Sequence, residues 1–271
     1  MSDYRFTILG CGSSGGVPRL PDNWGECDPA NPKNARRRCS MLVERFGTGG
    51  TTRVLIDTSP DLRSQLLDAH VGALDGVAYT HAHADHTHGL DDLRMVVYNM
   101  RSRVKVWADG DTTNDLLSRF GYAFVQPPGS DYPPILDLRA IDGAFTVEGA
   151  GGPITLTPFE VEHGRIDALG FRIGGLAYLP DVSDIPEAVW PMLDGLDIWV
   201  LDALRRTPHP SHAHLAKSLE WIARAAPTRA VLTNMHIDLD YATVEAETPA
   251  HITPAYDGMV LTLPADTPQT T

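Results

Sequence analysis

Short apolar runs recur along the whole chain and are separated by polar or glycine-rich segments. Runs of this length, bounded by turn residues, predict buried strands. Glycines between neighbouring runs, at 47–50 and 174–175, predict hairpins. The predicted strands cover residues 4–9, 40–46, 52–57, 76–80, 104–107, 154–159, 169–173, 176–179, 197–201 and 229–233.

Between several of these strands, apolar residues recur three or four positions apart, which predicts amphipathic helices. Thr112 or Thr113, Asp184 and Ser211 are the expected N-caps, and Pro227 should end the last helix. Strands that alternate with helices indicate an α/β fold. The predicted helices lie at 61–69, from 89–94 onwards, at 112–120, at 185–193 and between Ser211 and Pro227, whereas the tail 264–271 should be frayed.

Length and charge narrow the class of protein. The 271 residues suffice for one large domain, and we expect a single domain over 1–271. No apolar run reaches transmembrane length and the first residues lack a secretory pattern, so we expect a cytoplasmic protein with no membrane partner. The formal net charge of -13 argues against binding of long nucleic acid. Three cysteines are too few for a disulfide framework.

One stretch carries a dense set of metal-binding side chains directly after the predicted strand 76–80. His81, His83, Asp85 and His86 lie within six positions. His81 and His83 should point to the same side of an extended segment, and the other two fall where the chain turns. Imidazole and carboxylate groups bind zinc, manganese and iron. The alternative, a histidine-rich surface loop, would need no further ligands.

Three distant segments supply matching ligands. His163, Asp181 and His236 each follow a short apolar strand, as His81 does. Side chains at the carboxyl ends of successive strands can meet at one edge of a sheet. Each residue alone would be weak evidence, because a lone His or Asp is more often a surface residue. Their joint placement favours a dinuclear metal site.

Two further features could meet an anion. The turn 10–16 is rich in glycine, and it could either present the backbone N–H groups around Ser13 and Ser14 to a phosphate or be only a tight turn. The long loop 17–38 ends in a basic cluster, Arg36 to Arg38, which could be a solvated turn or could help to meet an anionic substrate.

The stretch HAHADH resembles the H-x-H-x-D-H signature of the metallo-β-lactamase-fold hydrolases. The resemblance extends to EHG at His163, LPD at Asp181 and LTNMH at His236. The opening ILGCGSSGGVP and the RRRCS segment resemble the phosphodiesterase branch, closest to the cyclic-phosphodiesterase accessory proteins of the carbon–phosphorus lyase pathway. The tRNA 3′-end processing endonucleases are more distant, and their basic tRNA-gripping arm is missing here.

This resemblance implies a four-layer α/β/β/α sandwich with two mixed sheets. It also implies two divalent ions, zinc or manganese. One would be held by His81, His83 and His163, the other by Asp85, His86 and His236, with Asp181 bridging. Asp85 is therefore expected to act as a ligand and a catalytic residue. A hydroxide bridging the two ions would be the nucleophile.

The leaving group needs a proton, and the segment 207–214 offers three histidines. By resemblance to the H-x-[ST]-x-x-x-A motif, His212 is the expected general acid and phosphate contact. The motif's hydroxyl residue is His214 here and its final alanine is Ser218, so His209 remains an alternative acid and substrate contact. His88 is expected outside the ligand set. The accessory proteins also carry a structural zinc on clustered cysteines. Cys27 and Cys39 lack that tight spacing, so the sequence does not decide whether they bind zinc.

The resulting hypothesis is a metal-dependent phosphodiesterase that hydrolyses a small phosphodiester, such as a 2′,3′- or 1,2-cyclic one. Hydrolysis of a thioester or lactone is the alternative, because the same fold supports it; tRNA 3′ processing is another. A non-enzymatic metal-binding protein of this fold would usually lack one or more ligands, and none is missing. A homodimer is left open.

Overall fold

The computed structural model describes residues 3–265, and these form two compact units. Unit 1 comprises Ser40–Thr155 together with the first strand and most of the last strand of the chain. Unit 2 comprises Gly10–Cys39 and Leu156–Met259. Both units are therefore built from segments that are distant in the sequence. The prediction of a single domain stays a prediction.

The sheet of unit 1 has seven strands in the order β14-β1-β2-β3-β4-β5-β6. A hairpin joins β2 to β3 in antiparallel register, with Gly47 opposite Gly50, and β3 to β6 are paired in parallel. The strands are β1 (Asp3–Gly10), β2 (Ser40–Gly47), β3 (Gly50–Ile56), β4 (Gly76–Ala78), β5 (Val104–Ala108), β6 (Leu136–Ala140) and β14 (Met259–Pro264).

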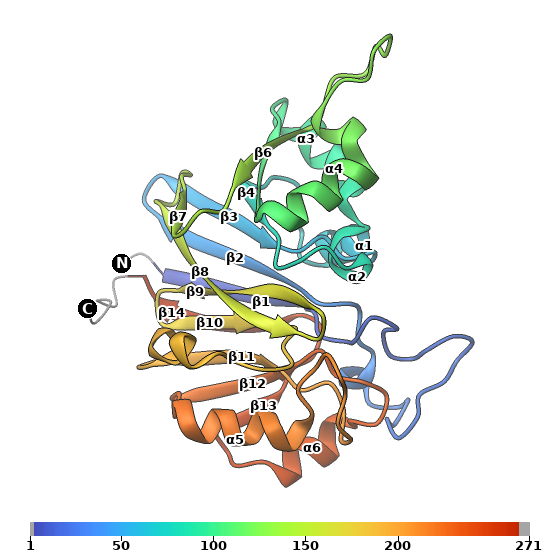
Figure 1. Ribbon diagram of the computed structural model, residues 1–271, viewed down its shortest axis with the longest axis vertical. Coiled ribbons are helices and arrows are strands. Elements are labelled where there is room, and N and C mark those ends of the chain that lie inside the picture. The colour runs from blue at the N-terminus through green and yellow to red at the C-terminus, as the bar shows by residue number, and fades with distance from the viewer. Residues whose placement is uncertain (1–2, 266–271) are drawn as a thin grey trace. The chain divides into compact units, whose positions relative to one another are not determined.

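Helices pack on this sheet and bury its apolar residues. Leu62 of α1, Leu93 of α3 and Leu116 of α4 form one core cluster with strand residues such as Val77 and Val106. Figure 1 shows α3 and α4 beside β4 and β6. The helices are α1 (Leu62–Asp68), α2 (Ala84–Thr87), α3 (Leu93–Met100) and α4 (Gly110–Phe124), with a 3-10 turn at Leu90–Asp92.

The second sheet, most of whose strands belong to unit 2, has the order β13-β12-β11-β10-β9-β8-β7. Its strands β8 to β10 are antiparallel and β10 to β13 are parallel. The strands are β7 (Phe145–Val147), β8 (Ile154–His163), β9 (Ile166–Ile173), β10 (Leu176–Leu179), β11 (Ile198–Asp202), β12 (Arg229–Thr233) and β13 (Ile252–Pro254).

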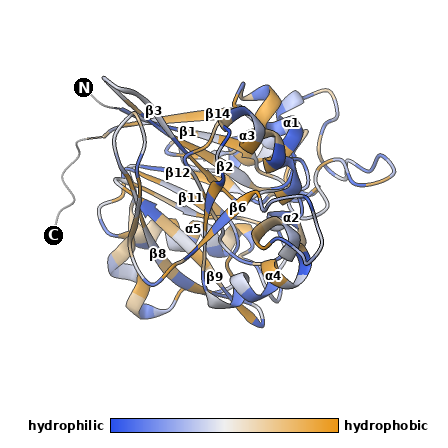
Figure 2. Ribbon diagram, turned by 90° about the horizontal axis from the view of Figure 1, so that it is seen from above, coloured by the Kyte–Doolittle hydropathy of each residue, from blue (hydrophilic) through white to orange (hydrophobic). Residues whose placement is uncertain are grey.

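Helix α5 (Leu215–Ala225) packs against β11, and α6 (Tyr241–Glu247) packs against β13. Figure 2 shows hydrophobic and hydrophilic residues alternating along α5, as expected for a helix with one buried face. Short 3-10 helices lie at Pro32–Asn34 and Glu187–Leu193. The prediction of an α/β fold with two mixed sheets and flanking helices is confirmed.

All three predicted helix caps are wrong, for local reasons. Asp109 caps α4 by accepting a hydrogen bond from the Thr112 amide, so the helix begins before the threonines. His214 caps α5 in place of Ser211. The segment after Asp184 is a 3-10 helix preceded by Pro186 without a side-chain cap.

Several short elements carried no strong pattern and were not predicted, namely α2, α6, β6, β7, β13 and β14. Strand β14 runs to Pro264, so fraying does not begin there, and residues 266–271 of the predicted tail lie outside the described residues. Within the described chain, every helix is too short or too polar to cross a membrane.

Candidate metal centre

The histidine-rich segment of unit 1 leaves β4 and turns into α2. His81 and His86 are buried, whereas His83 is exposed. The ring centroid of His81 lies 4.6 Å from that of His83 and 4.3 Å from that of His86. Oδ2 of Asp85 is 3.6 Å from Nε2 of His86. The structure therefore brings the four side chains of the motif together.

A buried carboxylate fixes the ring orientations of two of these histidines. Asp57 accepts hydrogen bonds from the Thr80 amide, from Thr80 Oγ1 and from His86 Nδ1, each at 2.8 Å. Because the hydroxyl of Thr80 donates its one hydrogen to Asp57, Oγ1 accepts a hydrogen bond from His81 Nδ1 at 3.0 Å. His81 and His86 are thus held in the tautomer that keeps Nε2 for a metal.

The backbone around Asp57 is shaped for this role. Its φ of 63° lies in the left-handed region that non-glycine residues seldom adopt. The Thr58 amide donates to the His86 carbonyl at 2.8 Å, which ties the end of β3 to α2. Gly89 must be glycine because a Cβ there would overlap the Ser59 carbonyl oxygen. Burial raises the pKa of Asp57, and the His86 ring opposes that rise.

In unit 2, His163 ends β8 and Asp181 follows β10, and both side chains are buried. His163 Nδ1 donates to the Ser211 carbonyl at 2.6 Å, so the neutral ring carries its lone pair on Nε2. That Nε2 lies 3.5 Å from Asp181 Oδ2. A lone pair and a carboxylate oxygen would repel each other at this distance unless a cation, a proton or a metal ion, is shared between them. The pair therefore fits a metal.

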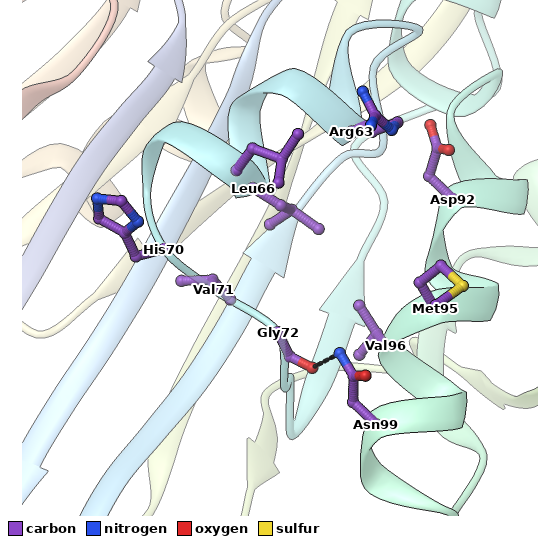
Figure 3. Close-up of a pocket in the computed structure, with 10 residues that line it drawn as sticks. Arg63, Leu66, His70, Val71, Gly72, Asp92, Met95, Val96 and Asn99 are labelled. Carbon is purple, nitrogen blue, oxygen red and sulfur yellow. Dashed lines mark hydrogen bonds between the residues drawn. The ribbon is translucent and has the colours of Figure 1, made fainter.

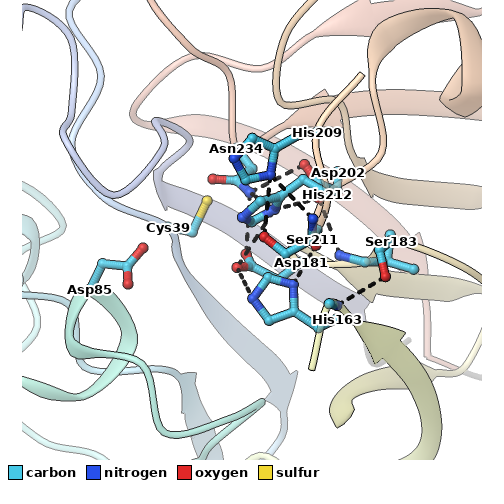
Figure 4. Close-up of polar contacts among 12 residues, drawn as sticks. Cys39, Asp85, His163, Asp181, Ser183, Asp202, His209, Ser211, His212 and Asn234 are labelled. Carbon is cyan, nitrogen blue, oxygen red and sulfur yellow. Dashed lines mark hydrogen bonds and ion pairs between the residues drawn. The ribbon is translucent and has the colours of Figure 1, made fainter. Parts of the chain in front are cut away.

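A second buried carboxylate orients His212 (Figure 4). Asp202 ends β11, and its Oδ2 accepts from His212 Nδ1 at 2.9 Å. Its Oδ1 accepts from Asn234 Nδ2 at 3.1 Å. Burial raises the pKa of Asp202 to about 6, and the charge of His212 opposes that rise. His212 Nδ1 also lies 3.9 Å from Asp181 Oδ2, and the ring is 15% exposed.

The neighbouring histidines have different surroundings. His209 Nδ1 accepts a hydrogen bond from the Ser211 amide at 3.3 Å, and its ring centroid is 5.1 Å from that of His212. Burial and the charge of His212 lower the pKa of His209. His214 Nδ1 accepts from the Lys217 amide at 3.3 Å as the cap of α5. This capping bond leaves His212 and His209 as the candidates for proton transfer.

The last predicted ligand, His236, follows β12. Its amide donates to the Leu204 carbonyl at 2.8 Å, and its Nδ1 pairs with Asp238 Oδ1 at 3.1 Å. This bond again leaves Nε2 as the ring atom that could coordinate a metal ion. His88, by contrast, packs its ring edge-on against Phe120 with centroids 5.6 Å apart.

Backbone amides of the glycine-rich turn donate hydrogen bonds within the protein. The amides of Gly12, Ser13 and Gly16 donate to the carbonyls of Arg37, Met235 and Ser13, respectively. These three N–H groups are used within the protein, which favours the tight turn over a phosphate cradle. The Ser13 hydroxyl is buried and has no hydrogen-bond partner among the described residues, whereas Ser14 is exposed.

Two arginines of the basic cluster make bonds within the protein, and one of them is buried. Arg36 is 2% exposed and donates to the Leu239 carbonyl at 2.7 Å. Arg37 Nε pairs with Asp257 at 3.0 Å. The cysteines are free thiols and buried. Within residues 3–265, no group of metal-binding side chains contains Cys27 or Cys39, so a structural zinc there finds no support.

Sequence reasoning assigned no role to Asp57, Asp202 or Asn234. Asp57 and Asn234 directly follow strands and Asp202 is the last residue of one, and this position at a strand end was the available signal. Asn234 also has a positive φ of 59°. Their function depends on which histidine each one meets, and that is visible only in the folded chain.

Residues 52–237 match the family model of the Beta-lactamase superfamily domain. The chain therefore belongs to the beta-lactamase superfamily, whose two large sheets flanked by helices it has. A solved structure of a diphosphatase from the PhnP family is 34% identical, with a TM-score of 0.86 over 97% of this chain and 98% of that one. This likeness shows that the chain also belongs to the PhnP family.

Two other relatives are informative. An octanoyltransferase of Porphyromonas gingivalis is 33% identical over 260 residues, covering 94% of this chain but 51% of the relative. The chain thus spans about half the length of this curated relative. The short form of human tRNase Z is 16% identical with a TM-score of 0.64, over 98% of this chain and all of that one. That likeness shows the fold alone.

The family and the donor set together define a metal-dependent hydrolase. Ligand atoms of His81 and His83 lie within 4.8 Å of one another in unit 1, as do those of His163 and Asp181 in unit 2. Nitrogen and carboxylate donors at such spacing suit a divalent ion of the first transition row.

Proposed function

We propose that this chain hydrolyses a small phosphodiester at a centre of two divalent metal ions. The observation that supports it best is the shared tautomer of the buried ligand histidines. His81, His86 and His163 each use Nδ1 in a hydrogen bond to the protein, which keeps Nε2 for coordination. Surface histidines would not need such partners.

The family resemblance implies the ligands of this proposal. His81, His83 and His163 would hold one ion, Asp85, His86 and His236 would hold the other, and Asp181 would be a ligand of both. Two bound divalent ions would supply a nucleophile at neutral pH and balance the charge of the phosphoryl oxygens. Zinc and manganese are the proposed ions, because both accept mixed nitrogen and carboxylate ligands.

His212 is the proposed general acid. The bond to Asp202 orients its ring, and Nε2 would carry the proton for the leaving oxygen. The partly exposed ring can reach a substrate, whereas Asp202 is fully buried and acts only through His212. His209, whose pKa is lowered, is less suited to donate a proton at neutral pH.

The charge of the protein supports a small substrate. At a net charge of -13, and with Arg36 and Arg37 engaged within the protein, little basic surface is offered to a polynucleotide. A diphosphate linkage is the second candidate, because the full-length relative of the PhnP family is a diphosphatase. Its phosphate leaving group depends less on an acid than an alkoxide does.

The test is a substrate panel with the full chain loaded with zinc or manganese. It contains a nucleoside 2′,3′-cyclic phosphate, bis(p-nitrophenyl) phosphate, a dinucleoside diphosphate and an octanoyl thioester. We expect both phosphodiesters to be cleaved. The thioester is included because one relative is named an octanoyltransferase. Preferred cleavage of the diphosphate would favour the second candidate, and preferred cleavage of the thioester would overturn both.

A further inference from the structure

Exposed aromatic rings gather at one place on unit 1. Among the described residues, the large apolar or aromatic side chains with high exposure include three tyrosines, Tyr98 at 57%, Tyr122 at 43% and Tyr132 at 73%. All three line a single cavity of about 400 Å³, together with Arg94. Because exposed aromatic surface of this kind is often a binding site, the clustering indicates that the cavity binds a ligand.

Two helices and a loop form the walls of the cavity. Two sides come from α3 and α4, which carry Tyr98 and Tyr122. The third is the loop 126–134, which joins α4 to β6 and extends from them in Figure 1. Within this loop the Ser130 amide donates to the Pro127 carbonyl, and the Tyr132 amide donates to Ser130 Oγ, both at 3.1 Å. These bonds hold the Tyr132 backbone in place.

The polar groups of the cavity are balanced in charge. Arg94 Nη2 pairs with Asp91 Oδ1 at 3.0 Å. Burial and the nearby Asp91 carboxylate raise the pKa of the Tyr122 hydroxyl. The guanidinium charge is therefore compensated, so the cavity does not select an anion. Aromatic rings line it together with residues that can form hydrogen bonds, such as Arg94 and Ser130.

We propose that this tyrosine cavity binds a nucleobase. A nucleobase is planar, uncharged and polar at its edge, which matches the rings and the hydrogen-bonding groups. Its stacking on an aromatic side chain is worth about 1–3 kcal/mol per base. The site goes beyond the proposed hydrolysis, because none of its residues belongs to the metal-ligand set. It would let the protein recognise nucleosides separately from phosphate.

A larger groove of about 460 Å³ lies between α1 and α3 (Figure 3). Leu66, Leu67, Met95 and Val96 make its walls mainly aliphatic, and a hydrogen bond from Asn99 to the Gly72 carbonyl crosses it. Nothing in the described residues shows what would cover this groove. The tyrosine cavity differs because its side chains specify the chemistry of a ligand.

The test is calorimetric titration of the metal-loaded full chain with adenosine, and with ribose as the reference ligand. Neither compound has a phosphate, so the outcome does not depend on the proposed hydrolysis. We expect adenosine to bind with a Kd of about 1 mM or tighter, which is about -4 kcal/mol, and ribose not to bind. Absence of saturation with adenosine would overturn the proposal, even if phosphodiesters are cleaved.

Matched variants test the role of the ring. Y132L removes the aromatic face from an exposed side chain and should weaken adenosine binding by about 5- to 100-fold. Y132F keeps the face and should bind within about twofold of the wild type. L117A, an exposed change on α4 outside the cavity, should bind as the wild type does. Equal affinities for Y132L and Y132F would overturn stacking, and an equal loss in L117A would overturn the location.

Discussion

Removal of His212 should slow hydrolysis most for substrates with a poor leaving group. A ribose alkoxide needs a proton as it leaves, whereas p-nitrophenolate departs readily without one. H212A should therefore lose most activity on a nucleoside 2′,3′-cyclic phosphate and distinctly less on bis(p-nitrophenyl) phosphate. General acid catalysis contributes about 10²- to 10⁴-fold, which sets the size of the first loss.

Loss of the hydrogen bond between Asp202 and His212 should lower activity by a smaller factor than loss of His212 itself. D202N removes the charge-assisted bond at 2.9 Å but keeps the shape of the side chain. Such a bond is worth about 1.5–3 kcal/mol, so D202N should lose about 10- to 100-fold on the cyclic substrate. H214A removes a helix cap and no proton donor, so its activity should be nearly unchanged on both substrates, although stability should fall by about 1 kcal/mol.

The assay is steady-state turnover of both substrates by each variant, with metal content measured on the same samples. An equal loss by H212A on the two substrates would refute general acid catalysis and leave His212 as a phosphate contact. A loss of metal would make it a ligand. If H209A alone shows the selective loss, the acid is His209, and the role of the Asp202 bond is wrong.

Three other predictions follow from the structure. D57N should weaken metal binding by about 10- to 100-fold, because Asp57 orients both His81 and His86, and competition with a chelating dye measures this; unchanged affinity would contradict that role. Burial opposes ionisation of Asp240, but hydrogen bonds from Thr243 and Asn34 lower its pKa to about 2. The ionised group therefore stabilises the fold by about 1–2 kcal/mol above pH 4, and this contribution is lost as the pH falls towards 2. In denaturant titrations, the stability gap between wild type and D240N should close over that window, and a constant gap would refute the assignment. Finally, precursor tRNA should remain uncut at physiological salt in a gel assay, and efficient trimming would favour the endonuclease alternative.

Residues with a local signal were predictable, and residues whose role comes from a distant partner were not. His81, His83, Asp85 and His86 were found because four donors lie close together in the sequence. Asp57 looked like an ordinary strand end, since its partner His86 is 29 residues away. Asp202 was passed over for the same reason. The sequence alone could not distinguish a solvated aspartate from one buried beneath a histidine.

Predictions from residue type were wrong where a neighbouring residue could serve as the helix cap or where distant groups surrounded the side chain. Thr112 is a good N-cap by type, yet Asp109 lies three positions earlier and accepts from its amide at 2.7 Å. His214 displaced Ser211 as the cap of α5, although histidine is a less common cap. Arg36 belongs to a cluster that resembles a solvated turn, but carbonyl groups from 236–239 bury it.

The central claim is that the two ligand sets hold two divalent ions. Anomalous diffraction from crystals of the zinc- or manganese-loaded full chain, with elemental analysis of the same preparation, tests it most directly. We expect about two ions per chain, one among His81, His83 and His163 and the other among Asp85, His86 and His236. D181A should lose activity far more than folding stability, because a bridging ligand serves the metals. A metal-free chain after reconstitution, or a single ion away from these histidines, would contradict the account.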